Sequence, residues 1–354
     1  MTLDPSNRRI SLRDMAKLLG VSHATVSLAL RNSPKVSLAQ QSRIKQFAEE
    51  IGYRPDPFLS ALAGYRQDKS TRSIQAALAW INAWDDSAKL RSYKEFDLYW
   101  KGASEAAEKF GYRMEEFQID SRMPPQRLHH ILETRGIRGI LLPPHAIAPN
   151  WVDFPWESYA ITRLGRTFSQ PRSHLVTADQ VANTITAIRA IQERGYQKIG
   201  FVTHKVEMGE VGHLFAAGFL GAQDALDKEA RLPLFKISDH PTRRLHAEFL
   251  KWFHTHQPDA IFSATDETPA LLAACGMRVP EDVALAVSSI QDGGADSGID
   301  QHPEEIGRVG VLLLNSLLQD RAYGIPRIFR QILVEGKWVD GSSLPMKNGM
   351  VRIP

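Results

Sequence analysis

The chain opens with two short amphipathic patterns that meet at a tight corner. The first pattern places apolar residues at helical spacing along one stripe, namely Leu12, Met15, Ala16 and Leu19. Ser11 is its predicted N-cap, and Gly20 ends it, because glycine adopts the left-handed backbone of a helix terminus. Ser22 is the predicted N-cap of the second helix, whose Val26 and Leu30 face the core. The pattern indicates two helices joined by a short turn, as in a helix-turn-helix.

A third amphipathic pattern follows the first two. Ser37 is its predicted N-cap with Gln40 as the capping-box partner, and Gly52 ends it. Its apolar face consists of Ile44, Phe47, Ala48 and Ile51. Three such helices would form a small all-α head over residues 1–55. Taken alone, the corner also fits a helical hairpin packed on another domain.

A short helical pattern runs from Asp56 to Gly64. Asp56 is the predicted cap, Pro57 takes the first helical position, and Gly64 ends the helix. Because a helix of about two turns is marginal alone in water, this one is expected to need a surface to pack against. Residues 66–73 then form a polar connector.

From Ile74 onward, short apolar runs alternate with amphipathic stretches. The apolar runs predict strands at 75–81, 113–119, 137–142, 158–162, 174–177, 198–203, 232–237, 259–263 and 283–287. The amphipathic stretches predict helices at 93–110, 124–135, 179–194, 209–227, 242–256 and 267–276. This alternation indicates parallel sheets with helices on both faces. So many strands favour two linked doubly wound lobes, with a ligand cleft at the carboxyl ends of their strands.

Charge is unevenly distributed along the 354 residues. The net charge is +3, but residues 1–66 hold ten Lys and Arg against five Asp and Glu, so this part is at +5 and the remainder at −2. A basic head on a nearly neutral body suits a phosphate-binding module that carries a sensor, although charge alone also fits an ordinary solvated surface. The 43% hydrophobic content is enough for a sizeable core beyond the head, so two or three domains are expected.

Cysteine usage and the N-terminal residues bear on the compartment. Cys275 is the only cysteine, so no internal disulfide can form, and its apolar surroundings predict a buried small residue. Met1 to Arg9 has no apolar signal-peptide core, and no stretch approaches the roughly eighteen apolar residues of a membrane span. The expectation is a cytoplasmic protein without a membrane partner.

Five sequence blocks, at their particular spacing, resemble the LacI/GalR family of bacterial transcriptional repressors. They are Gly20-Val21-Ser22, Thr25-Val26-Ser27, Val36-Ser37, Gly52-Tyr53 with Pro55, and Leu62-Ala63-Gly64. The body resembles the family more loosely, through residues 257–262, 279–283 and 299–301 and, more weakly, Gly218-Phe219. The resemblance implies an α/β effector domain of two lobes like those of periplasmic sugar-binding proteins, behind an all-α helix-turn-helix head.

The resemblance also implies domain boundaries. Residues 1–55 would be the DNA-binding head, 56–73 a hinge helix with its linker, and 74–354 the effector-binding and dimerisation domain. With the crossovers of the family, one lobe would contain about 74–163 and 293–322. The other would contain about 164–292 and 323–354.

In this family, the second helix of the helix-turn-helix reads base edges in the major groove. The implied base contacts are Leu12, His23, Ala24, Thr25, Ser27 and Leu28. Leu28 departs from the family, whose members often carry a basic or polar residue there, because leucine can only pack against a thymine methyl group or exclude water. The operator is therefore expected to differ from those of arginine-bearing relatives at that base. Leu28 as a core residue is the alternative, which Val26 and Leu30 disfavour because they already point inward.

The resemblance implies two further kinds of DNA contact. Phosphate contacts, which position the protein without reading sequence, are expected from Arg13, Ser22, Arg31, Asn32, Ser37 and Tyr53. Leu62 falls where the family inserts a leucine into the minor groove from the hinge helix. The alternative is a linker helix docked on the body through Phe58, Leu59 and Leu62.

The effector site is where the resemblance is weakest. The candidate effector contacts are Asn82, Trp84, Trp100, Arg163, Phe215, Asp266, Ser289 and Gln301. Three positions that usually supply polar ligand contacts in the family are here Phe215, Thr265 and Ser289. Aromatic faces, including that of Trp80, can stack on sugar rings, although a tryptophan near a strand end also fits a core or an interface. The ligand is therefore not a typical hexose, or the pocket is rebuilt, or no small effector is needed.

Enzyme and metal signatures are missing from the sequence. It has no Gly-x-Gly-x-x-Gly, no phosphate-binding Gly-Lys-Ser/Thr loop, no His-Glu-x-x-His and no Gly-x-Ser-x-Gly. His129-His130 and His254-x-His256 have no cysteine partner and only loosely placed carboxylates, so they are interpreted as surface residues. No cofactor, metal or catalytic residue is expected.

These patterns predict a homodimeric repressor that binds a palindromic operator. Its operator affinity would be set by a small molecule between the lobes, such as a sugar or a derivative of one, which binds with different affinity to two lobe arrangements. One alternative is a DNA-binding regulator whose cleft senses a protein or nothing. Another is a doubly wound enzyme with an appended DNA-binding head, which the missing motifs disfavour.

Overall fold

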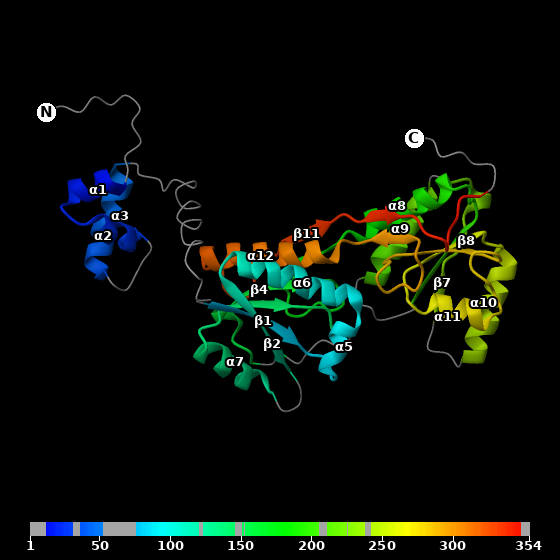
Figure 1. The fold of residues 1–354 in the computed structure, drawn as a ribbon, viewed down its shortest axis with the longest axis horizontal. Coiled ribbons are helices and arrows are strands. Elements are labelled where there is room, and N and C mark those ends of the chain that lie inside the picture. The colour runs from blue at the N-terminus through cyan, green and yellow to red at the C-terminus, as the bar shows by residue number, and fades with distance from the viewer. Residues whose placement is uncertain are drawn as a thin grey trace, which may run out of the picture. The chain divides into compact units, whose positions relative to one another are not determined.

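The computed structural model describes residues 12–30, 36–51, 76–119, 123–145, 151, 153–204, 211–224, 226–237 and 242–347. These residues belong to two units, residues 1–73 and residues 74–354 (Figure 1). The predicted cap Ser11, the helix end at Gly52 and the predicted helix at 56–64 lie outside the described residues. They stay predictions.

The described part of the first unit is a compact set of helices. These are α1 (Leu12–Leu19), α2 (His23–Leu30) and α3 (Leu38–Glu50). Their shared core contains Met15, Ala16, Val26, Ala29, Val36, Ile44 and Ala48. The predicted N-caps at Ser22 and Ser37 are confirmed, since their Oγ atoms accept the backbone N–H of Thr25 at 3.0 Å and of Gln40 at 3.4 Å. Gly20 has the positive φ (+66°) expected of a helix end.

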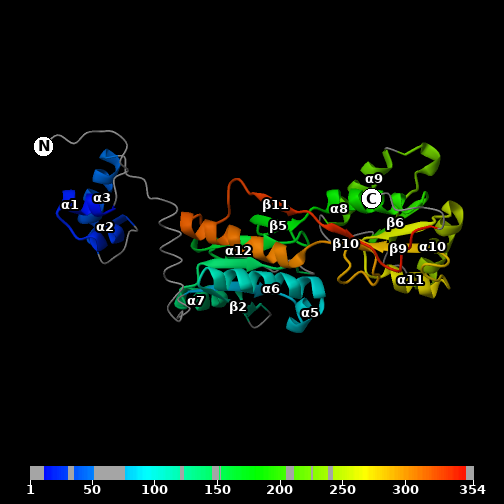
Figure 2. The ribbon, with the colours of Figure 1, turned by 45° about the horizontal axis from the view of Figure 1, so that its top comes forward.

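The first lobe of the second unit is built on a parallel sheet with strand order β11-β5-β4-β3-β1-β2. Its strands are β1 (Ala76–Asn82), β2 (Tyr112–Gln118), β3 (Gly139–Leu142), β4 (Ala160–Leu164), β5 (His174–Ala178) and β11 (Gln331–Val334). Helices α6 (Lys94–Lys109) and α12 (Pro303–Asp320) lie side by side on one face, and α7 (Pro125–Thr134) covers the other (Figures 1 and 2). Along β1, Leu78 and Trp80 enter one core while Ala79 and Ile81 enter the other, as in a strand buried on both faces.

The second lobe repeats this plan on a sheet with strand order β12-β10-β9-β8-β6-β7. Its strands are β6 (Ile199–His204), β7 (Phe235–Ile237), β8 (Ala260–Ser263), β9 (Ala284–Val287), β10 (Gly298–Asp300) and the antiparallel β12 (Lys337–Val339). Helices α8 (Gln180–Glu193) and α9 (Val211–Asp224) cover one face, and α10 (Thr242–His256) and α11 (Thr268–Ala274) the other. Short elements complete the chain: α5 (Ser87–Ser92), η1 (Trp156–Ser158) and η2 (Lys228–Ala230). The predicted class, an all-α head with two doubly wound parallel lobes, is confirmed.

The lobe membership of three strands differs from the expectation. β5 and β11 belong to the first sheet, because β5 pairs in parallel register with β4 on one side and β11 on the other. β10 belongs to the second sheet, where it lies between β9 and β12. The described chain therefore crosses between the lobes at Asp179, at 301–302 and at 335–336. Strand pairing sets these crossing points, and apolar runs along a sequence do not report pairing.

Two glycines allow α6 and α12 to touch along their backbones. A Cβ on Gly102 would lie 1.9 Å from the carbonyl oxygen of Glu304, and a Cβ on Gly307 would lie 2.0 Å from that of Tyr99. Only glycine fits at this separation. The two helices therefore form one tightly joined layer on the first sheet.

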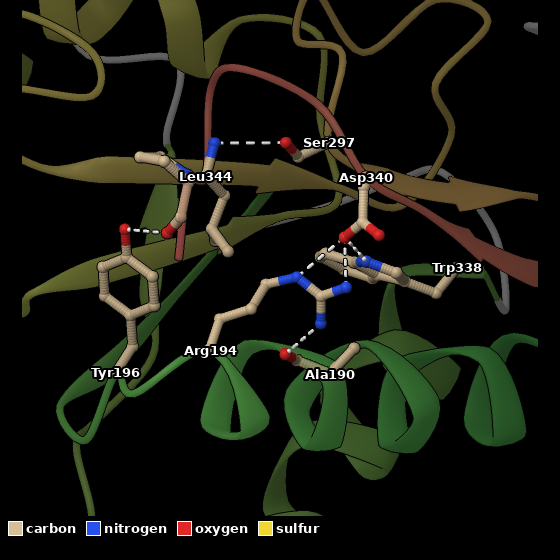
Figure 3. Close-up of polar contacts among 8 residues, drawn as sticks. Ala190, Arg194, Tyr196, Ser297, Trp338, Asp340 and Leu344 are labelled. Atoms are coloured by element: carbon tan, nitrogen blue, oxygen red, sulfur yellow. Dashed lines mark hydrogen bonds and ion pairs between the residues drawn. The ribbon is translucent and has the colours of Figure 1, made fainter. Parts of the chain in front are cut away.

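A polar cluster attaches the C-terminal segment to the second lobe (Figure 3). Arg194, at the end of α8, donates from Nε to Asp340 Oδ1 at 2.8 Å and from a terminal nitrogen to the carbonyl of Ala190 at 2.6 Å. The ring of Trp338 stacks on the guanidinium at 4.8 Å, and its Nε1 donates to Asp340 Oδ1 at 2.9 Å. Leu344 N donates to Ser297 Oγ at 3.1 Å, which extends the attachment along the segment.

Asp340→Ala is expected to lower the free energy of unfolding of the second unit by about 2 kcal/mol. The change removes an acceptor from the Arg194 side chain, which is only 10% exposed, while the 48% exposure of Asp340 limits the loss. Urea unfolding followed by tryptophan fluorescence measures the effect. Glu248→Ala is the control, because its exposed pair with Arg244 should contribute less than about 1 kcal/mol. Equal losses in the two variants would contradict the assigned role of Asp340.

Candidate nucleic-acid interface and ligand site

The first turn of α2 presents polar groups on the outside of the head. Ser22 and His23 are exposed, and the Thr25 hydroxyl lies 2.8 Å from the Ser22 hydroxyl. Val26 and Ala29 are fully buried on the opposite side of the helix. This one-sided burial leaves a short polar face, which is the form in which a recognition helix meets base edges.

Leu28 differs from the expectation of a free base-contacting side chain. It is partly buried and packs against the head core together with Leu30 and Val21. The physical reason is the short helix: with Val26 and Ala29 inward, a leucine between them can lay part of its side chain along the core edge. The base contact of Leu28 and its alternative interpretation as a core residue both stay predictions.

Several other candidate DNA contacts are only partly described. Ser37 is exposed at the start of α3. The side chains of Leu12, Arg13, Ala24 and Ser27 lie outside the described part of the chain. Residues Arg31, Asn32, Tyr53 and Leu62 also fall outside it. Their roles stay predictions.

At the carboxyl end of β1, Asn82 holds the following loop. Its Nδ2 donates to the Ser87 carbonyl at 2.9 Å and to Glu116 Oε1 at 2.7 Å, and its Oδ1 accepts the backbone N–H of Trp84 at 3.0 Å. The side chain is completely buried. Asn82 therefore positions Trp84 and has both ends of its amide engaged by protein groups.

Trp84 lies at the carboxyl ends of β1 and β3. Its Nε1 donates to the Pro144 carbonyl at 2.9 Å, and its ring packs against Tyr93 at a centroid distance of 5.8 Å. Lys89 Nζ lies 5.7 Å from the ring centroid. A partly buried indole next to a phenol at this edge of the sheet is suited to stacking on a flat or ring-shaped ligand.

His145 is a residue of this edge that sequence reasoning missed. Its Nε2 bonds to the Ile81 carbonyl at 3.0 Å, its ring packs on Phe168, and Nδ1 is buried without a hydrogen-bond partner in the described residues. Burial lowers the pKa of His145 from 6.5 to about 4, so the imidazole is neutral. Its position in the sequence, three residues after the predicted strand that ends at 142, could have indicated that it lies at this edge of the sheet.

The two lobes meet where α6 begins. Asp292, in the loop after β9, accepts the backbone N–H groups of Lys94 and Glu95, each at 2.9 Å. Ser289 Oγ donates to Glu95 Oε2 at 2.7 Å, so this candidate ligand contact is already bonded to the opposite lobe. Burial raises the pKa of Tyr93, and the nearby carboxylates of Asp266 and Asp292 raise it further. Asp266 and Ser289 therefore both lie near the start of α6, as the prediction of a shared site requires.

Other candidate effector contacts are used inside the lobes. Trp100 packs edge-on against Trp80 at 5.4 Å within the first lobe, and Arg91 lies 3.9 Å from its ring centroid. Phe215 is buried in the core of the second lobe. These two side chains are packing residues, because α6 and α9 turn them toward the sheets.

Arg163 and Gln301 lie at the carboxyl ends of strands, Arg163 within β4 of the first sheet and Gln301 directly after β10 of the second. Arg163, at the end of β4, is 5% exposed and donates to the carbonyl of Phe168. Gln301 Nε2 donates to the Ser288 carbonyl at 2.8 Å, which ties a crossing segment to the loop after β9. Both side chains are bonded to protein groups in this structure.

In the described residues, no group of three or more His, Cys, Asp or Glu side chains is arranged to hold a metal ion. A search of the same residues finds no helix that is both long and apolar enough to span a membrane.

Comparisons with known proteins agree with this architecture at both ends of the chain. The family model "Bacterial regulatory proteins, lacI family" matches residues 11–56, and the model "Periplasmic binding protein-like domain" matches residues 188–344. The head of this chain is thus of the lacI-family type, and a periplasmic binding protein-like domain follows it in the sequence. The chain is a DNA-binding transcriptional regulator.

The proteins that this chain resembles over longer stretches are regulators too. The transcriptional regulator CelR of Thermobifida fusca is 25% identical over 308 residues, which cover 84% of this chain and 85% of CelR. The probable repressor ExuR of Bacillus subtilis is 41% identical over 54 residues, but these cover only 15% of this chain and 16% of ExuR. A solved structure described as a transcriptional regulator CelR-cellobiose complex has a TM-score of 0.58 at 21% identity, with 94% of this chain and 99% of that chain covered. The head is thus the more similar part, and the two-lobed fold is shared.

Proposed function

We propose that this LacI-family regulator represses transcription as a homodimer bound to a palindromic operator. The observation that carries the proposal is the capped first turn of α2, with Ser22 and His23 exposed above the buried Val26. The proposed base contacts are Leu12, His23, Ala24, Thr25, Ser27 and Leu28. The proposed phosphate contacts are Arg13, Ser22, Arg31, Asn32, Ser37 and Tyr53, and the proposed minor-groove wedge is Leu62.

Selection of bound duplexes from a random library with the full-length protein tests this proposal. We expect one palindrome to be enriched, with a pyrimidine-purine step at its centre, where a wedge can kink DNA most easily. Two half-sites are expected because the two heads of a dimer are related by two-fold symmetry, and each head binds one half-site. Leu62→Ala should weaken binding to this palindrome. Binding that is sensitive to salt but not to sequence would contradict the proposal.

His23→Ala is expected to weaken binding to the selected operator about 5- to 150-fold, the range of a lost base contact. The change should also relax the preference at one base pair of each half-site. Fluorescence anisotropy with labelled operator duplexes at fixed salt measures both effects. His130→Ala is the matched control, because His130 is an exposed histidine of α7 in the second unit. Unchanged affinity and preference in His23→Ala would exclude His23 from base reading.

We infer that a small molecule, a sugar or a derivative of one, binds between the lobes and sets operator affinity. Support comes from Trp84 and His145 at the carboxyl ends of the first sheet and from the cellobiose named for the CelR structure. A shift of melting temperature with a panel of sugars and sugar derivatives tests this, since a ligand of the native state raises it. Because the protein acts on DNA, it is proposed to work in the bacterial cytoplasm, on the nucleoid.

A second candidate is a regulator whose cleft binds no small molecule. The observation in its favour is that Asn82 and Ser289, both candidate ligand contacts, have their polar groups bonded to other parts of the chain. An unchanged melting temperature across the whole sugar panel, together with a selected operator, would favour this second candidate.

A further inference from the structure

The first turn of α6 is capped by the opposite lobe. Tyr93, at its N-cap position, makes no side-chain hydrogen bond to the helix. The two carboxylate oxygens of Asp292 instead accept the N–H groups of Lys94 and Glu95, each at 2.9 Å. Unpaired N–H groups and the helix dipole make this end favourable for an anion. Asp292 therefore caps the helix in place of a local residue, although it lies 198 and 197 positions from Lys94 and Glu95 in the sequence.

A second bond crosses the lobes beside the first. Glu95 Oε2 accepts a hydrogen bond from Ser289 Oγ at 2.7 Å, and its Oε1 accepts one from Tyr99 OH at 3.1 Å. Tyr99 is a buried residue of the same helix, so it fixes the direction of the Glu95 side chain. Burial raises the pKa of Glu95, while the hydrogen bonds from Ser289 and Tyr99 act in the opposite direction.

The loop that carries Ser289 and Asp292 is held in shape by its own lobe. Ile290 N donates to the Ile299 carbonyl at 3.0 Å, and Gly293 N donates to the Ser289 carbonyl at 2.9 Å. A Cβ on Gly293 would lie 2.5 Å from that same carbonyl oxygen, so the turn is closely packed. These contacts hold Ser289 and Asp292 in place opposite the start of α6.

We propose that Asp292, which caps α6, and Ser289, which bonds to Glu95, form a latch that holds the two lobes together. A ligand that takes the hydroxyl of Ser289 must displace Glu95, so it acts by opening the latch. This last consequence rests on the ligand proposed above, whereas the latch itself does not.

The distance between the lobes in the free protein tests the latch. Spin labels are placed at Ser92→Cys and Ala270→Cys in a Cys275→Ser background, because both labelled positions are exposed and lie on opposite sides of the latch. Pulsed electron–electron double resonance then gives the distribution of distances between the two labels, in the absence of DNA and sugar. The parent protein should show one short, narrow distribution.

Asp292→Ala should add a population at longer distance, because the closed-to-open ratio falls about 5- to 30-fold when a helix cap is lost. Ser289→Ala removes a single hydroxyl and should give a smaller shift in the same direction. Asp292→Asn, which keeps one acceptor oxygen, should lie between the parent and Asp292→Ala. Lys101→Ala is the control, because its 2.8 Å ion pair with Glu304 joins α6 to α12 within the first lobe.

An unchanged distribution in both Asp292→Ala and Ser289→Ala would overturn the latch. If Asp292→Ala fails to fold, Ser289→Ala and Asp292→Asn decide the question by themselves. A shift in Lys101→Ala equal to that in Asp292→Ala would also contradict it. Because this measurement uses neither DNA nor ligand, its result does not depend on the operator selection or on the sugar panel. Failure of the latch would likewise leave the proposed function untouched.

Discussion

Gly307→Ala is expected to lower the free energy of unfolding of the second unit by about 3 kcal/mol. The added methyl group would lie 2.0 Å from the carbonyl oxygen of Tyr99 and 2.9 Å from the backbone nitrogen of Ala103. These atoms belong to the backbone of α6, so no side-chain rotation can relieve the overlap. The helices must separate, which opens the buried layer between them. For a unit of this size the melting temperature should fall by roughly 6–12 °C.

The same substitution at Gly221 provides a matched control. Gly221 is also in a helix, α9, but among the described residues no heavy atom outside its own stretch of helix lies within 4 Å of its added Cβ. Alanine is favoured over glycine inside a helix, so Gly221→Ala should raise the free energy of unfolding by up to about 1 kcal/mol. All seven tryptophans lie in the second unit, between residues 80 and 338, so fluorescence follows the unfolding of that unit. Similar results for both variants would mean that α6 and α12 do not touch along their backbones.

The second unit is expected to lose stability between pH 6.5 and pH 4 because of His145. Its Nε2 carries a hydrogen that it donates to the Ile81 carbonyl. Protonation of the imidazole would therefore place the second proton, and the positive charge, at the buried Nδ1. The pKa of His145 is about 4 in the fold and 6.5 when exposed, so the unfolded chain binds more protons in this range. This contribution is therefore fully present above pH 6.5 and is lost as the pH falls to 4, by about 3 kcal/mol in all.

Urea unfolding at a series of pH values measures this loss. His145→Gln keeps a donor near the Ile81 carbonyl and removes the titration, so its stability should change less with pH than that of the parent. The difference between parent and variant cancels the carboxylates that also titrate near pH 4. His130→Gln is the control, because an exposed histidine should leave the parent's pH dependence unchanged. Parallel curves for parent and His145→Gln would show that burial of His145 has no such effect.

Much of the fold could be predicted because local patterns carry it. The cap at Ser22, the corner at Gly20 and the alternation after residue 74 each depend on near neighbours in the chain. The expected strand at 259–263, for example, is β8 at Ala260–Ser263. The short strands β10, β11 and β12 gave no such signal, since β11 is mostly exposed and β10 and β12 are three residues long.

The ligand site was less predictable because its contacts join distant parts of the chain. Asn82 could be chosen from its place at a strand end, and the structure explains its burial by three hydrogen bonds, two of them local and one to Glu116, 34 positions away. Nothing near Glu95 in the sequence indicates Ser289 as its partner, 194 positions away. Trp100 was expected at a ligand because tryptophan suits stacking, yet the helix face that carries it meets Trp80. Pairing over long separations is set by the whole fold.

The three crossings between the lobes limit how a signal can pass through this protein. Asp179 N donates to the Val334 carbonyl at 2.9 Å, and Gly336 N donates to Asn183 Oδ1 at 2.7 Å, so two of the crossing segments are bonded side by side. The third, at 301–302, is held by Gln301 to the loop after β9. The crossing at Gly336 also lies beside this third one, since a Cβ on Gly336 would be 2.9 Å from the Asp300 carbonyl oxygen. Three neighbouring connections form a common hinge, so we expect the lobes to turn about these segments when the contact at Asp292 changes. A partner that senses the state of this regulator would then sense the angle between the lobes.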